Sequence, residues 1–323
     1  MLVLAVLASP SLALAADTTP PTSPGQPKEG SPSVDTDFDA DGSYSVYWPA
    51  ARDPQSGISA YRVQERIGAT GSWITLTSTR TAANWPVSGR LDKKTYYYRV
   101  QAKNKAGLWG PLSPASDGIL IDKTPPSQGA VTDDGAWTAS TSTLHAAWTA
   151  GSDPESGIAQ YEYLICQDSI PGTVLVNYTS VGSSMEVTRT GLNLVHGKKY
   201  FVGVRAKNQA GLYSSTNYSD GIGVDKNAPL IGTAQPADGS TYTEGNLLGI
   251  TVSAVDPDGD TLQYQFLLDG AVQQAWGAAS SWSWNTAGVV REHPITIQVR
   301  DIYGRQTDQV LKLFGYRRPR GTP

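Results

Sequence analysis

The sequence predicts an all-β protein built from tandem β-sandwich domains, and three observations support this prediction. Apolar residues alternate with polar ones at period two, the strand period, in many short segments. Turn-forming residues separate these segments, in a chain of 323 residues with 33 Gly and 21 Pro. Related segments return after about 100 residues, which is too long for a solenoid repeat and suits β-sandwich domains.

Matching segments place the three repeats. The entry segment DTTPP at 17–21 returns as DKTPP at 122–126 and as DKNAP at 225–229. YRVQAKNKAGLWG, which begins at Tyr98, returns as VGVRAKNQAGLYS from Val202. The Pro residues in the joints favour extended, semi-rigid linkers. We therefore expect a rod of three domains at residues 17–122, 123–225 and 226–315, preceded by a signal peptide at 1–16 and followed by a tail at 316–323.

Alternation within each repeat indicates the core residues. Tyr and Val residues of the late strand would share one face, namely Tyr96, Tyr98, Val100 and Ala102 in the first repeat and Tyr200, Val202, Val204 and Ala206 in the second. Trp48 and Trp148 occupy equivalent positions at the end of an earlier strand. The sequence therefore predicts structural roles for Trp48, Trp148, Tyr96 and Tyr200.

The first two repeats resemble fibronectin type III domains. The matching features are a Pro-rich entry, SVYW or HAAW for the strand with the core Trp, and LVHGKKYFVGVRAKNQAG near the end. The resemblance implies a tyrosine corner, in which Tyr96 and Tyr200 bond back to upstream backbone. The spacing fits at Tyr200, six residues after Leu194, whereas Tyr96 follows Leu91 by five residues without an intervening Gly.

The third repeat is different in sequence. Its segment SWSWNTAGVVREHPITIQVRDIYGRQTDQ, at 281–309, resembles the closing half of bacterial immunoglobulin-like or PKD-like sandwiches. The whole chain is thus expected to hold two fibronectin type III-like domains and one Ig-like domain in an extended rod. Such resemblances imply a fold and leave the function open, because these domains serve as spacers, adhesins and enzyme appendages.

The N-terminal segment indicates export. An apolar run from Leu2 to Leu14 contains Pro10 and ends in a small-x-small cleavage pattern. The run is too short for a membrane helix, so no membrane span is expected. The single cysteine, Cys166, cannot form an internal disulfide and is expected to be a buried strand residue. These features predict a secreted or cell-surface bacterial protein, with the periplasm as an alternative location.

Charge and motifs argue against several functions. With 25 Lys+Arg against 29 Asp+Glu the net charge is −4, which does not favour nucleic acid as a partner. Of the three His, His145 is expected on the outward face of a strand, His196 in a turn and His293 in a loop, so a shared metal or catalytic triad would need domains to converge. The motifs of hydrolases, metalloproteases and nucleotide binders are missing. We therefore expect no enzymatic activity and no cofactor, with a structural Ca²⁺ ion as the one exception considered.

An acidic nonapeptide occurs in each repeat. It reads DPQSGISAY at 53–61, DPESGIAQY at 153–161 and DPDGDTLQY at 256–264. In the first two copies, Asp, Pro and Gly are typical of a tight turn. In the third copy Asp256, Asp258 and Asp260 make a candidate Ca²⁺ site, although Leu267 stands where an EF-hand requires an acid. A partial site completed by another loop, even one of the neighbouring domain, and a purely structural turn both stay open.

Exposed aromatic residues form the second group of candidates. Trp73, Trp109, Trp137 and Trp276 lie in turn-rich or edge segments, where flat rings can stack on sugars or anchor a protein interface. The alternative is that they cover the open ends of the cores.

The sequence favours a non-catalytic protein for adhesion, spacing, or binding of an extracellular glycan or protein. Weak binding by each domain would be strengthened by repetition. Two alternatives remain, an accessory region of an extracellular carbohydrate-active enzyme or protease, and a subunit of a surface layer or filament.

Overall fold

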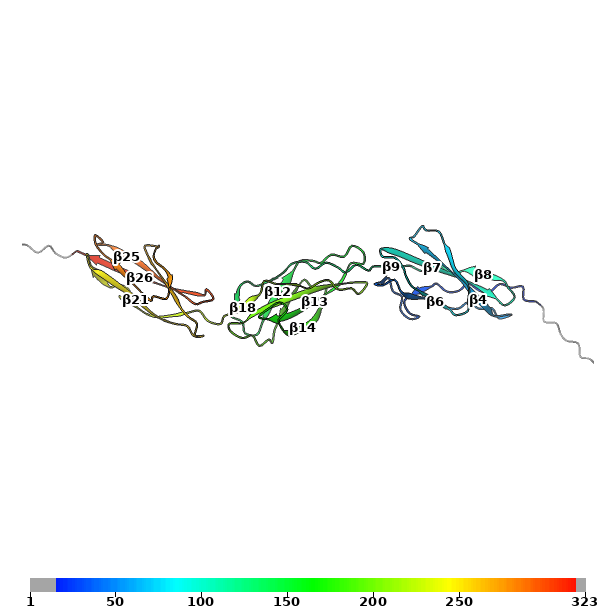
Figure 1. Ribbon diagram of the computed structural model, residues 1–323, viewed down its shortest axis with the longest axis horizontal. Helices are drawn as coiled ribbons and strands as arrows, with labels where there is room; N and C mark the ends of the chain where they lie inside the picture. Colours follow the sequence, from blue (N-terminus) through cyan, green and yellow to red (C-terminus); the bar gives the residue numbers. More distant parts are fainter. Residues whose placement is uncertain (1–15, 318–323) are drawn as a thin grey trace, which may run out of the picture.

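The computed structural model describes residues 16–317, which form only β-strands and irregular segments. Six sheets combine into three sandwiches that lie end to end (Figure 1). The predicted all-β fold of tandem immunoglobulin-like sandwiches is therefore confirmed. The predicted domain boundaries stay predictions, and the predicted signal peptide and tail lie almost entirely outside the described residues.

The first sandwich pairs a small sheet, in the order β1-β3-β6, with a larger one, in the order β2-β9-β7-β4-β5, where β8 also pairs with β7. All pairs are antiparallel except β2 with β9. The strands are β1 (Lys28–Glu29), β2 (Phe38–Asp39), β3 (Tyr44–Tyr47), β4 (Ile58–Ile67), β5 (Ile74–Arg80), β6 (Asn84–Val87), β7 (Lys94–Asn104), β8 (Trp109–Leu112) and β9 (Ile119–Ile121).

The second sandwich repeats this order strand by strand. Its sheets run β10-β12-β15 and β11-β18-β16-β13-β14, with β17 paired to β16. The strands are β10 (Val131–Asp133), β11 (Trp137–Thr138), β12 (Leu144–Trp148), β13 (Ile158–Gln167), β14 (Thr173–Gly182), β15 (Glu186–Arg189), β16 (Lys199–Asn208), β17 (Asn217–Tyr218) and β18 (Ile222–Val224). Cys166 is buried in β13 as a free thiol, as predicted.

The third sandwich keeps the strand order although its sequence departs from the others. Its sheets run β19-β21-β24 and β20-β26-β25-β22-β23. The difference lies in the last strand, which is one continuous element where the first two sandwiches have two short ones. The strands are β19 (Leu230–Gln235), β20 (Thr241–Thr243), β21 (Leu247–Val255), β22 (Gln263–Leu268), β23 (Ala271–Gly277), β24 (Ser281–Asn285), β25 (Glu292–Arg300) and β26 (Gln306–Tyr316).

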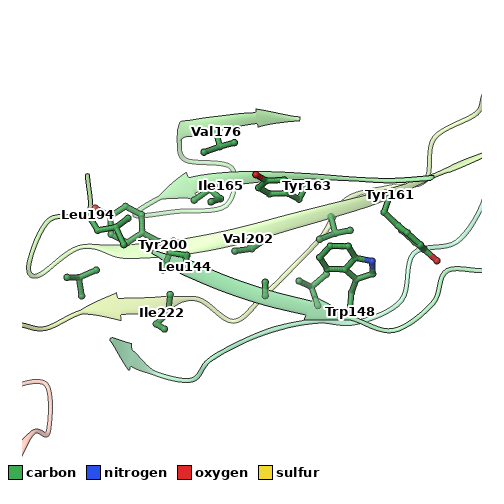
Figure 2. Packing of buried hydrophobic residues seen from close by; sticks show 14 of the residues in the cluster. Leu144, Trp148, Tyr161, Tyr163, Ile165, Val176, Leu194, Tyr200, Val202 and Ile222 are labelled. Atoms are coloured by element: carbon green, nitrogen blue, oxygen red, sulfur yellow. The ribbon is translucent and has the colours of Figure 1, made fainter. Parts of the chain in front are cut away.

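Each sandwich encloses its own apolar core. Alternate residues of β7 and β16 point inward, and all eight residues that the sequence placed on these inner faces are buried. In the second core, Trp148 lies edge-on to Tyr161 with ring centroids 5.9 Å apart (Figure 2). Trp48 packs in the same way on Tyr61 at 5.5 Å. The repeated Trp and the Tyr that ends the nonapeptide therefore form one recurring contact.

Tyr96 and Tyr200 both form the corner that the resemblance implied. The N–H of Leu91 donates to the hydroxyl of Tyr96 at 3.0 Å, and the N–H of Val195 donates to Tyr200 at 2.9 Å. In both loops the residue that donates the N–H lies five positions before the Tyr. The equivalent of Leu91 is therefore Val195 and not Leu194, so the spacing at Tyr96 matches that at Tyr200. Lys93 takes the positive φ of 59° where Gly197 has 77°.

Candidate functional site

An aspartate at the start of each entry segment connects the chain to the sandwich that follows. We call Asp17, Asp122 and Asp225 the linker aspartates. The backbone of Asp122 continues the first sandwich, since its N–H donates to the carbonyl of Asp39 at 2.9 Å. Asp225 likewise donates to Thr138 of the second sandwich at 3.0 Å. The side chains of both residues, fully buried, point into the next sandwich, so each belongs to two sandwiches at once.

In the second sandwich an amide holds the linker aspartate. Nδ2 of Asn208, at the end of β16, donates to Oδ2 of Asp122 and to Oδ2 of Asp153, both at 2.9 Å. The hydroxyl of Ser156 also donates to Asp122. Oδ1 of Asn208 accepts the N–H of Leu212 at 2.8 Å, which fixes the orientation of the amide. Two carboxylates are therefore joined by neutral donors.

The first sandwich contains the same arrangement. Asn104 donates to Asp17 and to Asp53 at 2.9 Å each, and Ser56 donates to Asp17 at 2.6 Å. We call this set of a linker aspartate, a turn aspartate, an Asn and a Ser the amide clasp. The amide clasp therefore recurs where the entry segment meets each of the first two sandwiches.

The repeated nonapeptide forms the turn that supplies the second carboxylate. Oδ1 of Asp53 accepts the N–H groups of residues 55, 56 and 57 at 3.1, 2.8 and 3.2 Å, and Asp153 accepts the equivalent groups at the same distances. Gly57 and Gly157 have φ of 77°, which favours glycine. Hydrogen bonds led by the Ser56 N–H and the Asn104 amide lower the pKa of Asp53. In these two copies the nonapeptide thus caps a turn and orients one carboxylate.

The third sandwich has the same framework with different side chains. Oδ1 of Asp256 accepts the N–H groups of Asp258 and Asp260 at 2.8 and 3.4 Å. Oδ1 of Asp301 accepts those of Tyr303 and Arg305 at 2.8 and 2.9 Å, as Asn208 does with Leu212. Asp301 therefore stands in place of Asn104 and Asn208.

This exchange removes the donors of the clasp. Gly259 occupies the position of Ser156, and Asp301 has a carboxylate oxygen where Asn208 has its NH₂ group. Both carboxylate oxygens of Asp225 are buried without a hydrogen-bond partner. The same is true of one oxygen in each of Asp256, Asp260 and Asp301. We call Asp225, Asp256, Asp260 and Asp301 the junction cluster.

Side chains from both sandwiches surround this cluster. Nε of Arg305 lies 2.9 Å from Oδ2 of Asp225, and Nε2 of His196, from the loop before β16, lies 3.2 Å from Oδ2 of Asp260. The rings of His196 and Trp137 both contact Tyr303, with centroids 5.5 and 4.6 Å apart. Burial, and then repulsion from Asp301, raise the pKa of Asp225 despite Arg305 and His196.

The three aspartates that the sequence selected as Ca²⁺ ligands have different surroundings. Asp256 and Asp260 belong to the junction cluster, whereas both oxygens of Asp258 accept hydrogen bonds from Asn227, from N–H at 2.8 Å and from Nδ2 at 3.1 Å. The sequence reasoning missed Asp225 and Asp301. Comparing AKNQAG in the second repeat with VRDIYG in the third would have revealed the exchange of Asn208 for Asp301.

The histidines differ from the sequence expectation in two respects. His196 lies against the acidic turn of the third sandwich, so the two domains do converge there. His293 was expected in a loop but lies buried in β25, where its Nδ1 is 2.7 Å from Asp269. Pro294 does not interrupt the strand, since it and its neighbours His293 and Ile295 all stay in register with β26. His145 lies on the outer side of β12, 2.7 Å from Asp134.

Each of the four candidate Trp residues has an intramolecular neighbour on its ring. The guanidinium groups of Arg99, Arg62 and Arg300 lie 4.4, 4.3 and 4.2 Å from the ring centroids of Trp73, Trp109 and Trp276, respectively. Trp137 packs on Tyr303 across the joint between the second and third sandwiches. The cations cover part of the aromatic surface that a sugar would use. Ligand contact by these residues stays a prediction.

Comparisons with known proteins leave the function of the chain open. No family model matches the chain. A stretch of 87 residues is 36% identical to human myomesin-2, and it spans 26% of this chain and 6% of myomesin-2. Among the described residues, no helix is long and apolar enough to cross a membrane.

Two similar solved structures contain fibronectin type III domains. The FN1–FN3 domains of chicken CNTN1 match 91% of this chain and 99% of their own length, at 15% identity and a TM-score of 0.29. The fibronectin(III)-like modules of Clostridium thermocellum CbhA match 58% of this chain and 94% of their own length, at 18% identity and a TM-score of 0.39. Both TM-scores are below 0.5, so the fold assignment depends on the strand pairing of this chain itself.

Proposed function

We propose that the chain is a non-catalytic, extracellular rod that holds its ends and loops at set separations for adhesion, or for binding of a glycan or protein. The observation that carries this proposal is the double role of the linker aspartates. Strand β9 ends at Ile121, and the next residue, Asp122, is already fastened inside the second sandwich by Asn208. The second sandwich thus holds the chain from the residue that directly follows the last strand of the first sandwich.

The linker between the second and third sandwiches is equally short. Strand β18 ends at Val224, and Asp225 follows at once with its side chain in the third sandwich. Trp137 and His196 of the second sandwich contact Tyr303 of the third. A short linker with fixed side chains restricts rotation between domains, which is what a spacer requires and what a flexible tether lacks.

A distance measurement between the first two sandwiches tests this proposal. Spin labels at Thr75 and Thr179, both on exposed strand positions, would be attached to cysteines introduced in a Cys166→Ala background of the full chain. A rigid spacer predicts a single narrow distance distribution in double electron–electron resonance. Asn208→Ala, which releases Asp122, is expected to broaden it, whereas Asn177→Ala on exposed β14 leaves it unchanged. A broad distribution without the substitution contradicts the spacer.

Partner binding needs a separate experiment. The full chain would be applied to a glycan array and to surfaces coated with extracellular matrix proteins. Binding that weakens strongly in a chain shortened to one sandwich supports adhesion by several weak sites. If neither surface retains the chain while the distance distribution is narrow, spacing alone remains as the function.

A further inference from the structure

The junction cluster in the third sandwich occupies the place that the amide clasp has in the second, and a comparison of the two shows which hydrogen-bond donors it lacks. In the second sandwich, the NH₂ group of Asn208 and the hydroxyl of Ser156 donate three hydrogen bonds to the carboxylates of Asp122 and Asp153. In the third sandwich, Asp301 and Gly259 supply none of these donors. The backbone framework is retained, and ligand atoms of Asp225, Asp260 and His196 lie close together at this place. Arg305 and His196 approach one oxygen each of Asp225 and Asp260, whereas the buried oxygens of Asp256 and Asp301 have no side-chain donor.

The convergent oxygens are deeply buried. Asp225 is 0% exposed and Asp301 is 1% exposed, and their free oxygens have no hydrogen-bond partner. An unpaired buried charge is strongly unfavourable, and buried charges in proteins are normally paired or bound to a metal ion. The four carboxyl groups of the junction cluster have one guanidinium, that of Arg305, and one imidazole, that of His196, beside them.

The spacing of ligand atoms on two members of the junction cluster and on His196 fits a hard divalent cation. Ligand atoms of His196, Asp225 and Asp260 all lie within 4.8 Å of one another. Two oxygens on opposite sides of a Ca²⁺ ion, each at about 2.4 Å, are about 4.8 Å apart. The possible donors are the four carboxyl groups of the junction cluster and the one imidazole of His196, and this excess of oxygen donors favours Ca²⁺ over Zn²⁺ or Cu²⁺.

We propose that Asp225, Asp256, Asp260 and Asp301 bind one Ca²⁺ ion at the joint between the second and third sandwiches. Asp258 is a neighbour and not a ligand, because both of its oxygens are engaged by Asn227. Since Asp225 belongs to the linker, the ion fastens the linker to the third sandwich as Asn208 fastens Asp122. This joint would thereby respond to calcium, whereas the first joint is held by hydrogen bonds from Asn208 and Ser156 to Asp122.

The substitution Asp301→Asn tests this proposal with a residue that the chain already uses at the equivalent place. In the full chain, unfolding of the third sandwich would be followed by calorimetry and assigned by hydrogen-exchange mass spectrometry, with EDTA, Ca²⁺, Mg²⁺ or Zn²⁺. At a Ca²⁺ concentration one hundred times Kd, its Tm is expected to rise by about 10–20 °C. Asp301→Asn is expected to raise the Tm in EDTA and to abolish the response to Ca²⁺.

Two matched variants complete the experiment. Asp308→Asn removes an exposed carboxylate from β26 and should respond to Ca²⁺ like the unchanged chain. Asp258→Asn should weaken Ca²⁺ binding by less than about tenfold, since charge but no ligand is lost. The proposal is overturned by a Ca²⁺ response that Asp301→Asn retains, or by no response in the unchanged chain. A response to Zn²⁺ alone that His196→Gln abolishes also overturns it.

Discussion

Replacing Asn208 with Asp would give the second sandwich the residue type that the third sandwich has at the equivalent position, Asp301. The side chain keeps its shape and its Oδ1 still accepts the N–H of Leu212. It loses the two Nδ2 hydrogen bonds to Asp122 and Asp153, both 2.9 Å long, and places a third carboxylate between them. The sandwich should become less stable although no apolar contact changes.

The magnitude follows from the lost bonds. A hydrogen bond to a charged group contributes about 1.5–3 kcal/mol, so two of them give a loss of about 3–6 kcal/mol before the added repulsion. For a domain of this size each kcal/mol shifts Tm by about 4–8 °C, so the Tm of the second sandwich should fall by at least about 12 °C at pH 7. Asn177→Asp, on exposed β14, should change it by no more than about 4 °C.

Acidification supplies an internal check on the cause. Burial opposes ionisation of Asp153, but hydrogen bonds from Asn208 and from backbone N–H groups still lower its pKa. In the variant, three adjacent carboxylates make protonation of one of them easier, and that proton restores a donor. The difference in Tm between the two proteins should therefore shrink as pH falls from 7 towards 4. Calorimetry of the full chain, with hydrogen exchange of β13 and β16, measures both effects. Equal melting at pH 7, or a difference independent of pH, would refute the reasoning.

Two further predictions concern the first and second cores. Burial, with repulsion from Asp35 and Asp117, raises the pKa of Glu29 to about 8. Because the folded state then holds the proton more tightly than the unfolded state, stability falls as pH rises from 4.5 to about 8, by at most about 1.4 kcal/mol per pH unit. Glu29→Gln should thus raise the Tm of the first sandwich at pH 8 and leave it unchanged at pH 5; equal effects at both would count against a buried carboxyl. Tyr200→Phe leaves the N–H of Val195 without its acceptor and should cost the second sandwich about 1–3 kcal/mol in urea unfolding, and no loss would mean that water replaces the hydroxyl.

The fold class could be predicted without the structure, because strand alternation is a local property of the chain and the duplication is visible in the sequence. The inward faces of β7 and β16, the core positions of Trp48 and Trp148, and the all-β sandwich architecture could all be predicted, since a period of two leaves one arrangement of inner and outer residues. The turn in the nonapeptide was predictable for the same reason, as Asp, Pro and Gly specify it within a few residues.

The contacts of the acidic turns could not be predicted from the sequence, because they depend on how distant segments pack together. Asp225 is 31 residues from Asp256 and 76 residues from Asp301 along the chain (256 − 225 and 301 − 225). The three lie at one joint because each follows the last residue of a strand that ends there, β18 in the second sandwich and β21 and β25 in the third. Likewise, the sequence selected Asp258 with its neighbours, whereas folding directs Asp258 to Asn227 and leaves Asp260 beside His196. Local sequence records the spacing of donors and acceptors on one loop. Which of them remain unpaired depends on the side chains that other strands bring to them.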